Sequence, residues 1–348
     1  MRAPRLLATA VLVLAVAACS NDTKADPTTV TLVTHESFVV SKEVLADFQK
    51  KSGLTVKILR SGDAGALVNK AVLSKGNPQG DVLFGVDNTF LSRAVDAGIF
   101  TAYEPRNLQN VPAALKADTD GKVAPVDYGD VCVNYDKAYY AKKGLQPPAS
   151  YADLLKPVYK DQLVVENPAT SSPGLAFLLG SVATYGDTGW KDYWTRLKAN
   201  GALVVDGWEE AYQQRFTVGS QGKGNRPLVV SYASSPPAEV VYAEKKPAHA
   251  PSGVATNTCF RQIEYAGLLD GAKNPSGGKK LLDFLLSAEF QKDMPLQMFV
   301  YPSVTGTPLP AEFTKYAATP EKPLTLPAAD ITKNRDAWID AWTNAVLR

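Results

Sequence analysis

Residues 30–59 read VTLVTHESFVVSKEVLADFQKKSGLTVKIL, and this stretch decides the fold. Its two ends, 30–34 and 54–59, are rich in β-branched residues and predict strands. Between them, Val44, Leu45 and Phe48 follow a helical spacing, with Ser41 as the expected N-cap and Gly53 as the end. A strand, a helix and a second strand in this order predict one unit of an α/β sheet.

The same alternation continues along the chain. A helix over 64–74, a strand over 81–86 and a helix that ends before Gly98 complete a mainly parallel sheet with helices on its faces. The extended segment 123–134 is then expected to cross into a second lobe, because 348 residues exceed what one hydrophobic core usually supports. For the second half we expect strands at 163–166, 202–205, 228–232 and 259–265, and helices at 175–185, 190–199, 208–216, 277–287, 288–294 and from 334 onward.

Composition excludes several classes of protein. The chain has 37 Lys and Arg against 35 Asp and Glu, a net charge of +2, which argues against a nucleic-acid partner. Two histidines and three cysteines leave little material for a His/Cys metal cage, so we expect no metal and no cofactor.

The first residues have the order of a secretory signal. Arg2 and Arg5 precede the apolar stretch 6–18, which is too short to span a membrane. The stretch 16–19, VAAC, resembles the lipobox of bacterial lipoproteins, and this resemblance implies removal of residues 1–18 and acylation of Cys19. Residues 19–27 are polar and read as a tether. The mature chain is then formally neutral and is expected to be extracytoplasmic.

Two cysteines, Cys132 and Cys259, remain after Cys19. In an oxidising compartment they are expected to form a disulfide, and the alternative is a pair of separate buried thiols.

Small polar and aromatic residues follow several predicted strands. They occupy positions 35–37, 61–63, 87–88, 170–172 and 232–235. An open α/β sheet binds ligands beyond the carboxyl ends of its strands. The sequence therefore predicts a ligand cleft assembled from both halves of the chain.

The chain resembles the solute-binding proteins of ABC importers, and particular stretches resemble their thiamine-binding branch. These stretches are 84–91 (FGVDNTFL), 126–130 (VDYGD), 167–175 (NPATSSPGL), 207–212 (GWEEAY), 230–236 (VSYASSP) and 299–302 (FVYP). The resemblance implies a type II periplasmic-binding fold, with residues 28–127 and 258–303 in one lobe and 128–257 and 304–348 in the other. It also implies a monomeric receptor, lipid-anchored outside the cytoplasm, that delivers thiamine or a thiamine phosphate to an ABC permease and its ATPase.

The resemblance also assigns ligand-binding positions. These are Asp63, Ala64, Ser171, Ser172, Trp208, Tyr232, Ala233, Ser234, Ser235 and Phe299, with Asp87, Asp127 and Tyr301 as further candidates. Aromatic rings suit a cationic heterocycle, an aspartate supplies counter-charge, and serines before a helix suit a phosphate. The chain departs from the family at three places: Phe299 replaces a common tryptophan, Ala64 a glycine, and His35 a common tyrosine. We therefore do not expect His35 to contact the ligand.

Two alternatives stay open at this point. The same fold carries ferric iron or polyamines, and the pair Tyr139 and Tyr140 has the residue type that binds iron, although it lies in a predicted helix. An extracytoplasmic hydrolase is the other alternative. Neither a Gly-x-Ser-x-Gly elbow nor a His-Glu-x-x-His motif occurs, and His249 has no acidic neighbour in sequence, so we expect no enzyme.

Overall fold

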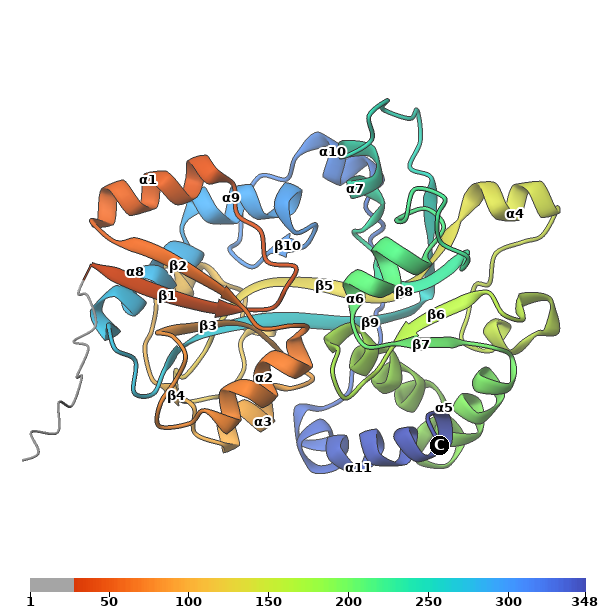
Figure 1. Ribbon diagram of the computed structural model, residues 1–348, viewed down its shortest axis with the longest axis horizontal. Coiled ribbons are helices and arrows are strands. Elements are labelled where there is room, and N and C mark those ends of the chain that lie inside the picture. Colours follow the sequence, from red (N-terminus) through yellow and green to blue (C-terminus); the bar gives the residue numbers. More distant parts are fainter. Residues whose placement is uncertain (1–27) are drawn as a thin grey trace, which may run out of the picture.

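The computed structural model describes residues 28–348 and shows two lobes side by side, joined by two long strands (Figure 1). The expected signal peptide, tether and Cys19 lie outside the described residues. The strands are β1 (Thr29–Thr34), β2 (Thr55–Arg60), β3 (Val82–Asp87), β4 (Phe100–Thr101), β5 (Ala124–Asp136), β6 (Leu163–Glu166), β7 (Leu203–Val205), β8 (Leu228–Tyr232), β9 (Ser252–Leu269) and β10 (Tyr301–Pro302).

Helices alternate with these strands. The α-helices are α1 (Lys42–Ser52), α2 (Ala64–Leu73), α3 (Leu91–Asp96), α4 (Lys137–Lys143), α5 (Ser172–Ala199), α6 (Trp208–Glu210), α7 (Pro236–Val241), α8 (Pro275–Leu285), α9 (Ala288–Gln297), α10 (Ala311–Tyr316) and α11 (Ala328–Val346). Short 3-10 helices are η1 (Leu108–Asn110), η2 (Ala113–Leu115), η3 (Asp153–Leu155) and η4 (Pro157–Tyr159), and η5 (Ala211–Arg215) is a π-helical turn.

One sheet runs through both lobes in the order β2-β1-β3-β9-β5-β8-β6-β7. In the first lobe, β1 pairs in parallel with β2 and β3, and in the second lobe β6 pairs in parallel with β7 and β8. Helices α1, α8 and α9 cover one face of the first lobe's sheet and α2 and α3 the other (Figure 1). These features confirm the predicted α/β class and the two-lobed type II fold.

Strands β5 and β9 connect the lobes. They pair antiparallel with each other, from Ala124 opposite Ala266 in the first lobe to Asp136 opposite Ser252 in the second. The register shifts between Val131 and Val133. A disulfide between Cys132 and Cys259 joins the two strands at this point. The two strands that connect the lobes are therefore covalently linked to each other.

Local sequence determines where α1 begins and ends. The Ser41 hydroxyl accepts a hydrogen bond from the amide of Val44 at 3.4 Å, which caps the helix at its N-terminus. At the other end Gly53 adopts φ +70, the left-handed conformation that glycine takes without steric cost. Both ends match the prediction from sequence.

The two helices predicted over 175–185 and 190–199 are both present as the two parts of α5, which is interrupted at Gly186, where φ is +67. The structure differs from the sequence prediction in two other helices and one strand. The predicted helix 208–216 is one turn of α6 followed by η5, and α11 begins at Ala328 rather than at 334. Strand β9 is 18 residues long, whereas only 259–265 was predicted. The residue boundaries of the lobes stay a prediction.

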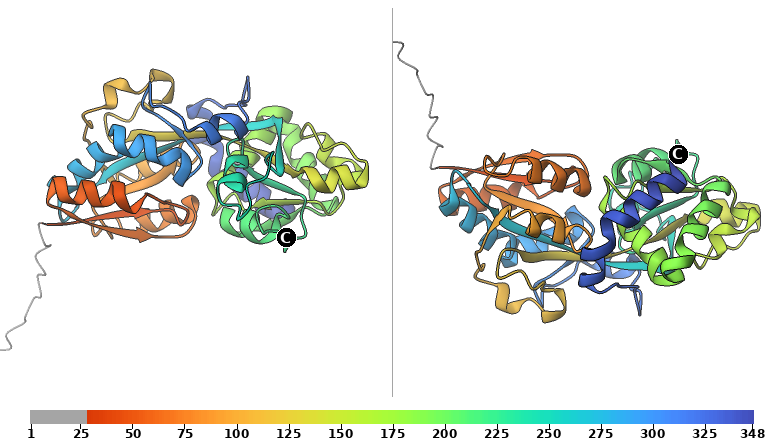
Figure 2. Two further views of the ribbon diagram at one scale, coloured as in Figure 1. Left: turned by 90° about the horizontal axis from the view of Figure 1, so that it is seen from above. Right: turned by 90° about the horizontal axis from the view of Figure 1, so that it is seen from below.

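Helix α11 lies beneath both lobes (Figure 2). Its Trp342 packs edge-on against Trp194 of α5 in the second lobe, and its Arg335 donates to the Ser92 hydroxyl of α3 in the first lobe at 2.9 Å. Within residues 28–348 there is no helix with the length and apolar character that a membrane span needs.

Candidate functional site

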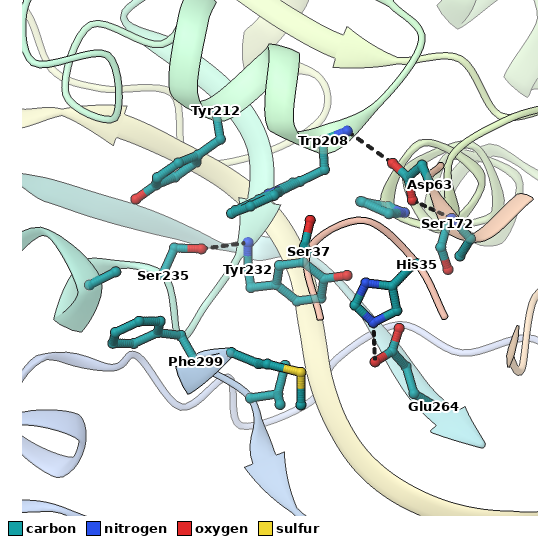
Figure 3. Close-up of a pocket in the computed structure, with 15 residues that line it drawn as sticks. His35, Ser37, Asp63, Ser172, Trp208, Tyr212, Tyr232, Ser235, Glu264 and Phe299 are labelled. Atoms are coloured by element: carbon teal, nitrogen blue, oxygen red, sulfur yellow. Dashed lines mark hydrogen bonds and ion pairs between the residues drawn. The ribbon is translucent and has the colours of Figure 1, made fainter. Parts of the chain in front are cut away.

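A pocket opens between the lobes, beyond the carboxyl ends of β1, β2, β7 and β8 (Figure 3). Its empty volume is about 670 Å³, which includes open solvent at its mouth. The lining residues are His35, Ser37, Asp63, Ala64, Ser172, Pro173, Trp208, Tyr212, Tyr232, Ser235, Ala238, Glu264, Met298, Phe299 and Val300. Both lobes contribute to this lining, as the strand-end loops of the sequence predicted.

Aromatic rings form much of the wall. Trp208 stacks on Tyr212 with ring centroids 4.9 Å apart, and its indole N–H donates to the Ser231 hydroxyl at 2.9 Å. These two contacts fix the plane of the Trp208 ring. Tyr232 and Phe299 line the pocket beside it (Figure 3). The arrangement offers ring faces to a flat ligand, and such faces attract cations.

Asp63 joins the lobes at the edge of the pocket. It caps α2 by accepting from the Ala64 amide at 2.6 Å, and its Oδ2 accepts from the Trp208 amide of the second lobe at 2.9 Å. Burial raises the pKa of Asp63, and the amides of Trp208 and Ala64, with the neighbouring Ser171 and Ser172, offset part of that rise.

The two serines at the N-terminus of α5, Ser171 and Ser172, form hydrogen bonds within the protein. Ser171 caps α5 by accepting from the Gly174 amide at 3.5 Å. The Ser172 hydroxyl donates to Asp87 and accepts from the Gln262 side chain at 2.8 Å. The carboxylate of Asp63 lies near the N-terminus of α5, where the sequence suggested a phosphate site.

Further buried acids lie behind the pocket. Glu264 lines it, and Asp127 and Asp87 raise the pKa of Glu264 further, beyond the larger effect of burial. Burial also raises the pKa of Glu166, which is completely buried on β6. Among the residues described, none that lines the pocket is lysine or arginine. The pocket is consequently acidic, and its wall is aromatic.

His35 lies 3.8 Å from a Glu264 oxygen, measured from its Nε2, which is longer than a hydrogen bond. Burial, helped by the charge of Arg60, lowers the pKa of His35 to about 4. The imidazole is therefore neutral near pH 7 and supplies no positive charge to the pocket.

Seven residues of the predicted site line the pocket. They are Asp63, Ala64, Ser172, Trp208, Tyr232, Ser235 and Phe299. Six others lie outside the lining: Ser171, Ala233, Ser234, Asp87, Asp127 and Tyr301. Of these, Asp87 and Asp127 are buried directly behind it, while Tyr301 stacks on Tyr128 with ring centroids 5.3 Å apart.

Several lining residues were not predicted as ligand contacts, and His35 was expected not to be one. Ser37 lies in the predicted loop 35–37, Tyr212 lies in the stretch 207–212, and Met298 precedes Phe299 in the chain. Glu264 lies inside a strand that has no motif of its own, so only the pairing of β9 with its neighbours brings it to the pocket.

The residues considered for other functions lie elsewhere. Tyr140 of α4 is buried and donates to the side chain of Gln162 at 2.6 Å, and neither Tyr139 nor Tyr140 lines the pocket. His249 is exposed on a loop. No group of three or more His, Cys, Asp or Glu side chains within the described part of the chain is placed to hold a metal ion.

Comparison with known proteins places this pocket in context. Residues 77–334 match the family model described as bacterial extracellular solute-binding protein. The chain is 32% identical to a thiamine-binding periplasmic protein of Brucella suis biovar 1 (strain 1330), over 97% of this chain and 96% of that protein. It is 31% identical to the thiamine-binding periplasmic protein of Escherichia coli (strain K12), over 91% and 93% of the two chains.

Solved structures agree with this relationship. A periplasmic thiamin binding protein superposes with a TM-score of 0.79 at 28% identity, covering 92% of this chain and 96% of the other. Iron-bound HitA from Pseudomonas aeruginosa superposes with a TM-score of 0.73 at 20% identity, over 92% and 99% of the two chains, which shows the shared fold alone. The matched segment covers most of the chain, and the chain therefore belongs to the family of bacterial extracellular solute-binding proteins.

Proposed function

We propose that the protein is an extracytoplasmic receptor that binds thiamine between its lobes and delivers it to an ABC importer. One observation carries the proposal: the interlobe pocket combines the rings of Trp208, Tyr232 and Phe299 with the carboxylates of Asp63 and Glu264. Thiamine joins a flat aminopyrimidine to a permanently cationic thiazolium. Aromatic faces attract such a cation by about 0.5–2 kcal/mol, depending on how far it is desolvated.

The relatives support this ligand over the alternatives. Two of them, in Brucella and Escherichia, are thiamine-binding periplasmic proteins by name, and both align over more than nine-tenths of the chain. Ferric iron would need hard oxygen ligands that converge on one point, and the tyrosine pair of α4 lies outside the pocket. We infer a binding protein rather than an enzyme, because the family consists of solute-binding proteins.

Among the forms of the vitamin, the pocket favours unphosphorylated thiamine. A phosphate needs cationic or unoccupied N–H donors. Here the lining that the structure describes holds no lysine or arginine, and the carboxylate of Asp63 lies near the N-terminus of α5. Binding should therefore weaken in the order thiamine, thiamine monophosphate, thiamine diphosphate.

The direct test is to identify the natural ligand. The protein is purified from its own host, denatured, and the released small molecules are identified by mass spectrometry. We expect thiamine in stoichiometric amount. Release of an iron chelate or a polyamine would replace this proposal with the alternative.

Membrane attachment is a separate part of the proposal, resting on the stretch VAAC at 16–19. We infer that Cys19 carries a lipid and that the mature chain stays at the cell membrane as a monomer. Labelling cells with an alkyne fatty acid should mark the wild-type protein and leave Cys19→Ser unmarked. Equal labelling of both would contradict the anchor.

A further inference from the structure

Two carboxyl groups face each other across the strands that connect the lobes. Asp127 of β5 pairs in register with Glu264 of β9, and the two residues are 1% and 9% exposed. Glu264 lines the pocket, while Asp127 lies behind it. Within the described chain no hydrogen-bond donor reaches either oxygen of Asp127. Like charges directly opposite in a sheet are unfavourable, so this pair is not expected to carry two charges.

A proton shared between the two groups resolves the conflict. Two buried carboxyl groups at one site retain a proton well above the usual pH range. Burial raises the pKa of Asp127 to about 8, and the neighbouring Glu264 carboxyl offsets part of this rise. Burial and the charge of Asp127 raise the pKa of Glu264 well above its usual value. The pair therefore holds a proton at neutral pH when the pocket is empty of ligand.

The surroundings of Glu264 supply no counter-charge. The groups that face it are His35 after β1, Asp63 before α2, Asp87 of β3, Asp127 of β5 and Tyr232 of β8. His35 is neutral above pH about 4, and the burial of Tyr232 raises its phenol pKa well above the usual value. The remaining three groups are acids. A cation that enters this pocket thus meets carboxylates without a competing side-chain cation.

We propose that Glu264 recognises the positive charge of the ligand and that binding of the cation expels the proton that Glu264 shares with Asp127. This inference rests on the proposed function, because it takes the thiazolium of thiamine as the cation. The O–H bond of the carboxylic acid breaks, its electron pair stays on the carboxylate oxygen, and the proton passes to solvent. The ligand's fixed charge takes the proton's place beside the pair.

The thermodynamic linkage between ligand binding and proton release sets the expected number of protons released and the pH dependence of the affinity. An opposite charge within about 4–6 Å lowers a carboxyl pKa by about 1–3 units. Binding near pH 7 should therefore release about half a proton or more per ligand, and the affinity should rise by up to about tenfold per pH unit through this range.

The test is calorimetric titration of ligand-stripped, full-length mature protein with thiamine in two buffers of different ionisation enthalpy, phosphate and Tris. The difference between the observed binding enthalpies, divided by the difference between the ionisation enthalpies of the two buffers, gives the number of protons released per ligand. We expect a clear difference for the wild type, and dissociation constants that fall as the pH rises from 6 to 8.5.

Three variants test which carboxyl group releases the proton. Glu264→Gln should bind thiamine about tenfold more weakly, without proton release. Asp127→Asn should release less than half as much as the wild type, because Glu264 loses its like-charged neighbour. Asp130→Asn is the matched control on the same strand, where the carboxylate pairs with Arg261 at 2.6 Å, and it should release protons as the wild type does. Melting temperatures establish that each variant is folded.

The outcomes separate the two proposals. Thiamine binding with equal heats in both buffers would overturn the proton release and leave the proposed function intact. Release that persists in both Glu264→Gln and Asp127→Asn would assign the proton elsewhere and also overturn it. No binding of thiamine in any buffer would overturn both the inference and the proposed function.

Discussion

The main-chain amide of Trp208 donates to Oδ2 of Asp63 at 2.9 Å, and this hydrogen bond connects the second lobe to the first at the rim of the pocket. The same carboxylate accepts from Ala64 of its own lobe at 2.6 Å. Removal of the carboxylate leaves partly buried amides without an acceptor, which costs about 1–3 kcal/mol. Asp63→Ala should therefore weaken thiamine binding about 5- to 100-fold in a calorimetric titration. An unchanged affinity would exclude Asp63 from closure and from the site.

The aromatic wall can be tested by changing the size of one ring. Trp208, Tyr232 and Phe299 line the pocket, and tryptophan attracts a cation more strongly than phenylalanine does. Phe299→Trp should tighten thiamine binding by a few-fold, and Phe299→Leu should weaken it. An uncharged analogue of thiamine, with a thiophene ring in place of the thiazolium, serves as the control and should respond less. Equal responses to the charged and uncharged ligands would show that Phe299 contributes packing alone.

Gly65 tests how closely the lobes must approach. A Cβ at this position would lie 2.7 Å from the carbonyl of Thr170 in the other lobe, which accepts a hydrogen bond from Ala66 at 3.1 Å. Gly65→Ala should hold the lobes apart and weaken binding. The same Cβ would lie 2.9 Å from the ring of Phe90 in its own lobe, so the melting temperature of the ligand-free protein should fall, despite the higher helix propensity of alanine. Scattering curves that show the same ligand-induced compaction as the wild type would contradict this role.

The buried acid pair predicts how stability depends on pH. The Asp127 pKa is raised to about 8, from about 3.9 in an unfolded chain, so the folded state binds the extra proton between these values. The contribution of this proton to the free energy of unfolding is complete below pH about 4 and is lost as the pH rises through about 8. From pH 6.5 to 8.5, where His35 stays neutral, the free energy of unfolding should fall by up to about 1.4 kcal/mol per pH unit for each proton bound. Denaturant unfolding of Asp127→Asn should give a flatter profile, and parallel profiles would contradict the assignment.

The disulfide between Cys132 and Cys259 closes a loop with a sequence separation of 127. Such a link stabilises a protein by about 2–4 kcal/mol, in large part by restricting the unfolded chain. The double variant Cys132→Ser, Cys259→Ser should lower the melting temperature, whereas thiamine affinity should stay within a few-fold because neither cysteine lines the pocket. A large loss of affinity in a fully folded variant would show that the disulfide sets the position of the lobes.

Local patterns predicted the parts of the fold that depend on local sequence. Helix α1 begins after Ser41 and ends before Gly53, as predicted. The loops that follow strands contribute Asp63, Trp208 and Tyr232 to the pocket. Comparison with known proteins confirms the family resemblance carried by the six quoted stretches.

The remaining features depend on contacts between distant segments. Glu264 reaches the pocket because β9 pairs with β3 and β5, with register shifts in both pairings, and no local pattern specifies such a register. The position of Asp63 near Ser171 and Ser172 also depends on how the two lobes meet.

The most direct measurement of the central claim is a paired titration of ligand-stripped protein with thiamine and with its uncharged thiophene analogue. We predict saturable binding of one thiamine per protein, with quenching of tryptophan fluorescence, and a clearly weaker response to the analogue. Equal affinities for the two would contradict recognition of positive charge by the acidic, ring-lined pocket, and no binding of thiamine would contradict its assignment as the ligand.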